Sequence, residues 1–217
     1  MLANLQSLSE FLEQIFERCP LRISVKTRLG MESIEEFPDI LDCFNRFPLS
    51  ELIVHPRIRK QFYKGGVSID SFCHALQFSK APVCYNGDLC TPADLQALKQ
   101  TFPTLQAAMI GRGLIGNPSM LFGIPDRASL YAYHEELIEE YCRIFGSTHN
   151  AMCRMKEHWH MLLGLFRDSE KLGKQLRKCM NYDVFRDITK EILTQLPLNS
   201  ECTAAWRERT PFETVKL

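Results

Sequence analysis

The feature that most constrains this chain is a repeat of four short segments, each of which begins with apolar residues and ends in polar residues or glycine. The four segments are Leu21–Gly30, Glu51–Arg57, Ala81–Asp88 and Leu105–Gly113. They recur about every 25 to 30 residues, which is the length of one βα unit. The stretches between them carry apolar residues at helical spacing, as in Ile34, Phe37, Ile40, Leu41 and Phe44. Strands that alternate with helices form a parallel sheet, so we predict an α/β fold.

One of these helices has a complete start signal. Thr91 has the side chain of an N-cap, Pro92 suits the first helical position, and Asp94 follows three residues after the cap. We therefore predict that a helix begins at Pro92.

The pattern changes after Phe122. From Arg127 to about Leu196 we find apolar residues at helical spacing only. The intervening sequence FGIPDR contains glycine and proline and is typical of a linker. We predict an α/β domain over residues 1–123, a small all-helical bundle over residues 124–197 and a loosely structured tail over residues 198–217.

Composition excludes several classes of protein. The 217 residues carry a formal net charge of zero, so any nucleic-acid site has to be a local feature. Nine cysteines without a Cys-x-x-Cys pair argue against both a disulfide framework and a thiolate metal site. No apolar run approaches the roughly 20 residues that span a bilayer. We expect a cytoplasmic protein with reduced thiols, no metal and no membrane segment.

Polar side chains stand where each predicted strand ends. In a parallel sheet, ligands bind beyond the carboxyl ends of the strands. Each group has a structural alternative: a frayed strand end, a structural histidine, or a tight turn at the Asn-Gly and Gly-x-Gly pairs. Their recurrence after four successive strands favours a ligand site over four unrelated turns. The residues concerned are Lys26, Arg28, His55, Arg57, Asn86, Gly87, Asp88, Gly111, Arg112 and Gly113.

The alternation of side chains in the first predicted strand adds to the expectation of a ligand site. Val25 and Thr27 lie on one face of the strand, and Lys26 and Arg28 lie on the other. If the apolar face meets the helices, the two cations point to the opposite side of the sheet. Burying a cation is costly unless an anionic ligand or a carboxylate pairs with it.

Four sequence motifs together resemble a known family. "ISVKTRLG", "IVHPRIRKQFYKG", "PVCYNGDLCTPADL" and "MIGRGLIGNP" are similar to consecutive signatures of the tRNA-dihydrouridine synthases, and the similarity runs from about Arg22 to Arg177. The resemblance implies a flavin-dependent (β/α)8 (TIM) barrel of which this chain holds strands five to eight. It also implies FMN as cofactor, NADPH as reductant, tRNA as substrate and a monomeric full-length enzyme.

The resemblance assigns roles to individual residues. Lys26 contacts the flavin, and His55 lies over the flavin site. The ribityl-phosphate end of FMN is bound by Asn86, Gly87, Asp88, Gly111 and Arg112. The mouth of the substrate site is shaped by Arg28, Arg57 and Tyr63.

The helical segment "RMKEHWHMLLGLFRDSEKLGKQLRK" resembles the family's C-terminal domain, which grips tRNA. Between Arg154 and Lys190 there are nine lysines and arginines against five aspartates and glutamates, a local excess of four positive charges. Such residues at helical spacing can contact phosphates, although a solvated helix face is the alternative. The predicted RNA contacts are Arg154, Lys156, Lys171, Lys174, Arg177 and Lys178.

Two parts of the family pattern are missing. The sequence lacks the first-strand segment under the flavin ring and the fourth-strand Asn-x-Gly-Cys-Pro motif with the catalytic cysteine, and neither Cys19 nor Cys90 replaces that cysteine. We therefore expect the C-terminal half of a synthase, as a fragment, a mis-started gene or a degraded copy, with no catalytic residue and no activity alone. For the whole enzyme the resemblance implies that NADPH reduces FMN, that hydride passes to C6 of a flipped uridine, and that the cysteine protonates C5.

Two other functions remain open. One is a non-catalytic half-barrel that binds phosphate or RNA. The other is a different FMN-dependent barrel that acts on small molecules, which the basic helical segment disfavours.

Overall fold

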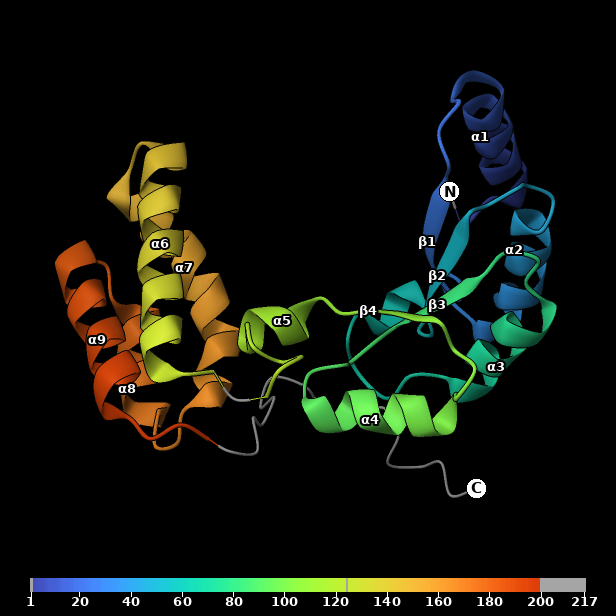
Figure 1. The fold of residues 1–217 in the computed structure, drawn as a ribbon. Helices are drawn as coiled ribbons and strands as arrows, with labels where there is room; N and C mark the ends of the chain where they lie inside the picture. Colours follow the sequence, from blue (N-terminus) through green and yellow to red (C-terminus); the bar gives the residue numbers. More distant parts are fainter. Residues whose placement is uncertain (1, 124, 200–217) are drawn as a thin grey trace. The chain divides into compact units, whose positions relative to one another are not determined.

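The structure is a computed structural model that describes residues 2–123 and 125–199 (Figure 1). These residues form two compact units. The first comprises residues 2–88 and 96–110, and the second comprises residues 89–95 and 111–199. The tail expected over residues 198–217 lies outside the described residues except for Leu198 and Asn199, which pair with the chain near Phe166.

The first unit contains a sheet of four parallel strands in sequence order. The strands are β1 (Ser24–Arg28), β2 (Glu51–His55), β3 (Val83–Asn86) and β4 (Ala107–Met109). Each strand pairs with the one before it in the chain, and all three pairings are parallel. The α/β class predicted from the sequence is therefore confirmed. Closure of these strands into a barrel stays a prediction.

Helices cover one side of this sheet (Figure 1). The helical segments of the first unit are α1 (Leu5–Arg18), η1 (Ile34–Glu36), α2 (Phe37–Phe44), η2 (Arg59–Gln61) and α3 (Ile69–Phe78). Tyr85 of β3 is fully buried, and its ring centroid lies 4.9 Å from that of Phe72 of α3 in an edge-on arrangement. In β2 the residues from Leu52 to His55 are all buried, and Val54 lies on the same face as its register partner Tyr85. The apolar face of the strands thus packs on the helices.

Helix α4 (Pro92–Thr101) begins at the predicted residue. The backbone N–H of Asp94 donates to Thr91 Oγ1 at 3.2 Å, and the N–H of Thr91 donates to Asp94 Oδ2 at 2.8 Å. These reciprocal bonds form a capping box, which satisfies backbone donors that the first turn of a helix leaves unpaired. The predicted start signal is confirmed.

The second unit is helical apart from one isolated bridge among its described residues. Its helices are α5 (Arg112–Gly116), α6 (Arg127–Phe145), α7 (Thr148–Leu162), η3 (Leu163–Leu165), α8 (Glu170–Lys178) and α9 (Tyr182–Gln195). Trp159 of α7 is 1% exposed and lies in a cluster with Ile138 of α6, Leu176 of α8 and Ile192 of α9. Apolar side chains at helical spacing therefore form the core of this unit. No described helix of either unit is long and apolar enough to cross a membrane.

Candidate functional site

Strand register places several predicted site residues on one face of the sheet. Lys26 pairs with Ile53, which pairs with Cys84, and one row further along Arg28 pairs with His55. Paired residues of neighbouring strands project to the same side of a sheet. Lys26, His55 and Asn86 therefore share the face opposite the one that packs on the helices, at the carboxyl ends of β1, β2 and β3.

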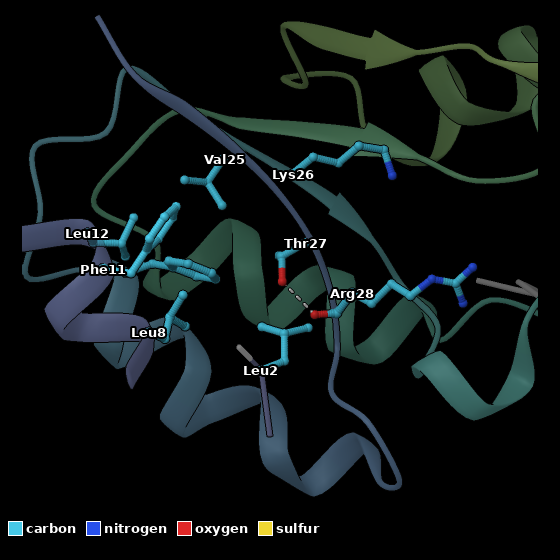
Figure 2. Close-up of a pocket in the computed structure, with 9 residues that line it drawn as sticks. Leu2, Leu8, Phe11, Leu12, Val25, Lys26, Thr27 and Arg28 are labelled. Carbon is cyan, nitrogen blue, oxygen red and sulfur yellow. Dashed lines mark hydrogen bonds between the residues drawn. The ribbon is translucent and has the colours of Figure 1, made fainter. Parts of the chain in front are cut away.

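Figure 2 shows how β1 divides its side chains between the two faces. Val25 extends toward Phe11 of α1, whereas Lys26 and Arg28 extend away from that helix. A pocket of about 430 Å³ lies on the helix side. It is lined by Leu2, Leu8, Phe11, Leu12, Val25, Lys26, Thr27, Arg28 and Phe44. Apart from Lys26, Thr27 and Arg28, this lining is apolar.

The ammonium group of Lys26 has no carboxylate partner among the described residues. Its side chain is accessible at the surface, but surrounding protein atoms desolvate the ammonium and, with repulsion from Arg28, lower the pKa of Lys26. In the same row, burial and the negative charge of Glu51 raise the pKa of the Cys84 thiol to about 11. A cation without a counter-ion beside a neutral thiol suits an anionic or electron-rich ligand.

His55 ends β2 and contacts an arginine two residues further on. Arg57 is 1% exposed, and its Nη1 lies 3.3 Å from His55 Nε2. Its Nη2 donates to the carbonyl of Gly65 at 2.6 Å and forms an ion pair with Asp88. The buried Nε of Arg57 has no hydrogen-bond partner among the described residues. The resemblance places Arg57 at the substrate mouth; in the structure its side chain is buried, and its role at a substrate mouth stays a prediction.

The Asn-Gly-Asp triplet after β3 uses both of its polar side chains within the protein. Asn86 Nδ2 donates to the carbonyl of Met109 at 2.8 Å and so ties β3 to β4. Asp88 holds Arg57 and adopts a φ of 48°, a conformation that aspartate tolerates better than most residues. A phosphate would be repelled by the Asp88 carboxylate, which is engaged by Arg57.

A side chain at Gly87, between those two residues, would crowd three neighbouring side chains. A Cβ atom on Gly87 would lie 3.2 Å from Val67 Cγ1, 3.3 Å from Tyr85 Oη and 3.4 Å from His55 Cδ2. The backbone of the loop therefore approaches the His55 ring directly, which links the ends of β2 and β3.

Arg28 and Tyr63 lie beside His55. The guanidinium carbon of Arg28 lies 5.5 Å from the centre of the Tyr63 ring, and Arg28 Nη1 donates to the carbonyl of Ile58 at 2.9 Å. The ring centroids of Tyr63 and His55 are 6.3 Å apart, and Tyr63 is 53% exposed. An exposed aromatic ring with a cation beside it is a surface on which planar ligands commonly stack.

Gly111 and Arg112 belong to the second unit, and the structure does not group them with the residues above. Gly111 precedes α5, and open space surrounds the position of its missing Cβ atom. A Cβ atom on Gly113, in contrast, would lie 2.2 Å from the carbonyl oxygen of Leu89. The second glycine of Gly-Arg-Gly is therefore a packing requirement.

Helix α8 exposes a basic surface. Leu176 and Gly173 are buried, while the lysines and arginine predicted on this helix are exposed. These four residues have no ion-pair partner among the described residues. They are Lys171, Lys174, Arg177 and Lys178. Free basic side chains on one helix can neutralise phosphates.

The two predicted RNA contacts on α7 have partners within the protein. Arg154 forms an exposed ion pair with Glu157 at 3.0 Å. Lys156 is half-buried, and its Nζ donates to the carbonyl of Cys179, the C-cap of α8. A cation there satisfies a terminal carbonyl and interacts favourably with the helix dipole. Lys156 thus joins two helices.

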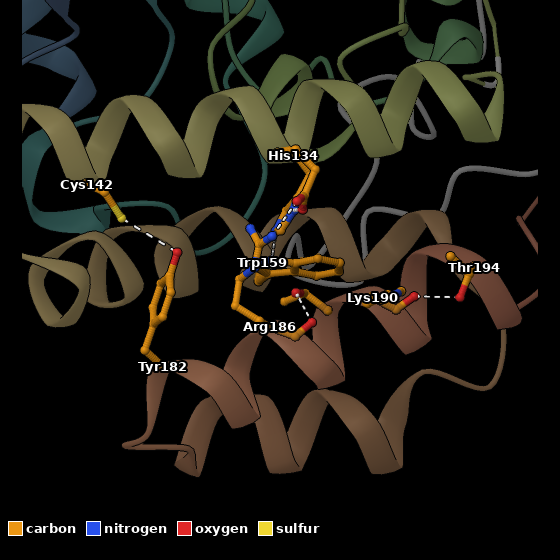
Figure 3. A network of polar contacts seen from close by, with 9 residues as sticks. His134, Cys142, Trp159, Tyr182, Arg186, Lys190 and Thr194 are labelled. Carbon is orange, nitrogen blue, oxygen red and sulfur yellow. Dashed lines mark hydrogen bonds and ion pairs between the residues drawn. The ribbon is translucent and has the colours of Figure 1, made fainter.

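Sequence analysis missed a buried polar network between α6, α7 and α9 (Figure 3). Trp159 Nε1 donates to His134 Nε2 at 3.2 Å, and His134 Nδ1 lies 3.1 Å from Glu135, which pairs with Arg186. Burial lowers the pKa of His134, while Glu135 opposes the shift. A signal was present in the sequence, because His134 lies four residues from both Leu130 and Ile138 on the apolar stripe. The polar groups of this network bond to one another, which indicates a structural role.

These observations define a class of protein. The first unit is a parallel α/β sheet with ligand-type side chains at its carboxyl ends, and the second is a helical unit with an exposed basic helix. No group of three or more potential metal ligands occurs within the described ranges. The sequence profile of the dihydrouridine synthases matches residues 1–208, so this chain belongs to the dihydrouridine synthase family.

Curated relatives agree with this family. The tRNA-dihydrouridine(16) synthase of Haemophilus influenzae is 23% identical over 164 residues, which cover 72% of this chain and 52% of that protein. The enzyme of the same name from Escherichia coli K12 is 32% identical over 103 residues, covering 46% of this chain and 32% of that protein. The Vibrio vulnificus protein is 29% identical over 118 residues. The chain thus spans about a third to a half of the length of these relatives.

Proposed function

We propose that this chain takes part in the reduction of uridine to 5,6-dihydrouridine in tRNA, with FMN as cofactor and NADPH as reductant. The observation that carries the proposal is the ammonium of Lys26, which has no carboxylate partner within the described ranges and lies on the same sheet face as His55 and Asn86, in a member of this family. FMN, when bound, supplies the hydride chemistry.

The residues of the first unit fit such a cofactor. Lys26 would hold an electron-rich oxygen of the ligand, because no carboxylate of the described residues pairs with its ammonium group. His55 would donate a hydrogen bond, and the loop at Gly87 would present its backbone. Tyr63 would screen the ring system from water. By resemblance, Gly111 and Arg112 remain candidates for phosphate contacts.

Flavin binding tests this part of the proposal. Titration of FMN with the chain, followed by quenching of flavin fluorescence, should show saturable binding that Lys26→Met weakens about tenfold or more, the usual effect of losing a charged hydrogen bond. Lys80→Met, which removes an exposed lysine after α3, is the matched control and should leave the affinity unchanged. No saturable binding, or equal affinities of both variants, would contradict the proposed site.

We further propose that α8 contacts tRNA phosphates without reading the sequence of the bases. The support is the exposed, unpaired basic surface of this helix. Lys174→Glu with Lys178→Glu should weaken tRNA binding at low salt and reduce the slope of log affinity against log salt by about two, because each lost phosphate contact reduces the slope by about one. A double variant at Lys80 and Lys190, with the same change in net charge, is the control. Unchanged tRNA affinity in the first variant would contradict the proposed phosphate contacts and show that α8 is only a solvent-exposed helix.

A polypeptide of these 217 residues should not form dihydrouridine alone, because its sequence contains no Asn-x-Gly-Cys-Pro motif. Incubation with unmodified tRNA, FMN and NADPH, followed by mass spectrometry of the nucleosides, tests this expectation, and turnover would contradict it. A chain that binds tRNA but not FMN would instead support the alternative of a non-catalytic RNA-binding protein.

The free cysteines support an origin in a reducing compartment. All eight cysteines within the described residues are thiols and none forms a disulfide. We therefore propose that the protein works in the cytoplasm.

A further inference from the structure

We propose that Arg57 is a positioning residue that keeps His55 as a neutral imidazole with its proton on Nδ1. Nothing in the sequence motif distinguishes the two neutral forms of His55. The contact between Arg57 Nη1 and His55 Nε2, at 3.3 Å, does distinguish them.

Hydrogen-bond chemistry determines which ring nitrogen carries the proton. A guanidinium has five N–H donors and no acceptor, and it keeps its charge at all physiological pH values. Nε2 must therefore accept the bond from Arg57 Nη1. A proton on Nε2 would bring two donors face to face. The proton of the neutral ring thus resides on Nδ1.

Arg57 cannot move away from this contact without breaking others. Its side chain is 1% exposed, and its Nη2 is engaged by both the carbonyl of Gly65 and the carboxylate of Asp88. The ring atom bonded to Nε2 is Cδ2. It lies 3.4 Å from the position that a Cβ atom of Gly87 would occupy. One edge of the ring is therefore enclosed by Arg57 and Gly87, and Nδ1 lies on the opposite edge.

The charged groups that the described residues place near His55 also disfavour a second proton. Arg57 contacts the ring, and Arg28 is its register partner on β1, while Lys26 lies one row away on the same face. The Asp88 carboxylate is engaged by Arg57, and the Tyr63 ring is 6.3 Å from the His55 ring. An imidazolium would add a buried positive charge beside a guanidinium, which costs free energy.

The tautomer of His55 does not depend on the proposed function, but the role of that tautomer in the reaction rests on it. In this tautomer Nδ1–H is the donor of the His55 ring, because Nε2 accepts from Arg57. His55 would be an electrophilic hydrogen-bond donor at this site.

Nitrogen NMR of the unmodified chain tests the proposal directly. The 217-residue chain is labelled with 15N-histidine, and long-range proton–nitrogen correlations are recorded at pH 7 without FMN or tRNA. The His55 signals are assigned by their disappearance in His55→Gln. We expect a protonated Nδ1 and a bare Nε2. A protonated Nε2, or protons on both nitrogens, would overturn the proposal whatever the variants show.

Three variants separate the effect of Arg57 from a general loss of structure. Asp88→Asn keeps Arg57 and should keep the Nδ1–H form. Adding Arg57→Met to that variant removes the guanidinium without leaving Asp88 as a buried unpaired carboxylate, and His55 should change to a mixture of both tautomers. Arg59→Met removes an exposed arginine two residues further on and should leave the spectrum unchanged. A retained Nδ1–H form in the folded double variant would show that Arg57 does not select the tautomer.

Failure of this inference is distinguishable from failure of the proposed function. The tautomer is measured without any cofactor, so an absence of FMN binding leaves the NMR result intact. Conversely, FMN binding with a protonated Nε2 would reject the role of Arg57 and retain the flavin site.

Discussion

Arg57 and Asp88, which are 31 residues apart in sequence, form a buried ion pair that joins the loop after β2 to the loop after β3. Their side chains are 1% and 5% exposed. The loops after β2 and β3, two of the four predicted ligand loops, are thus joined by an ion pair that is shielded from water. The same guanidinium contacts His55, so the ion pair and the orientation of that ring depend on each other.

Replacing one partner of this ion pair should lower the stability of the first unit. Asp88→Asn leaves the guanidinium buried without a counter-charge and should lower the free energy of unfolding of the first unit by about 3 to 5 kcal/mol. Hydrogen exchange of the β2 and β3 amides in increasing urea measures this loss within the correct unit. The double variant Arg57→Met, Asp88→Asn leaves no charge unpaired and should lose less. Equal losses in both variants would mean that the charge of Arg57 is not the cause.

The pKa of His134 predicts a pH dependence for the second unit. Burial lowers this pKa in the folded state, so the unfolded chain binds more protons as the pH falls through about 6.5, the ordinary value for histidine. Stability should therefore decrease below pH 6.5 and be fully present above it. In His134→Gln, which can still accept from Trp159, this decrease should be smaller.

Urea unfolding between pH 5 and pH 8, followed by Trp159 fluorescence in a Trp206→Phe background, measures the effect. His158 is also a partly buried histidine with a lowered pKa, so part of the decrease should remain in the variant. His160→Gln replaces an exposed histidine and serves as the control. Superimposable pH profiles for wild type and His134→Gln would contradict the prediction.

Close packing at Gly113 predicts a difference between two glycine replacements. Gly113→Ala would place a methyl group 2.2 Å from the backbone oxygen of Leu89, and we expect a loss of about 1 to 3 kcal/mol or more in the second unit. Gly173→Ala is a matched control in α8, because its nearest atom, at 2.8 Å, is a terminal methyl of Leu163 that can rotate. Alanine also favours a helix interior over glycine by about 1 kcal/mol. Unfolding followed by Trp159 fluorescence should rank Gly113→Ala as the less stable variant, and the opposite order would exclude this account.

The cysteines should differ in reactivity. Cys84 is buried with a pKa of about 11, whereas Cys73 and Cys153 are exposed. The thiolate is the reactive form, so iodoacetamide at pH 8 should modify the two exposed cysteines first and leave Cys84 largely unmodified. Mass spectrometry of the peptides at successive times measures the order. Modification of Cys84 at the rate of Cys153 would show that the site face is open to solvent around this thiol.

Local patterns in the sequence were sufficient for the elements and for their inward and outward faces. The recurring βα unit predicted β1 to β4, the Thr91 capping box predicted the start of α4, and alternation in β1 placed Lys26 opposite the helices. Each of these depends on residues within one or two turns of a helix or along one strand. A period of 2.0 or 3.6 residues is enough to determine which side of an element is apolar.

The partners of the polar side chains were decided by tertiary structure. Arg57, which the resemblance places at the substrate mouth, is buried against Asp88, and Lys156, a predicted RNA contact, donates to a carbonyl at the end of α8. His134 and Trp159, 25 residues apart, form a bond that no local motif records. An arginine after a strand has the same sequence pattern whether it meets a ligand or a carboxylate from another loop. The difference arises only when packing of distant elements removes water from the side chain and leaves one counter-charge within reach.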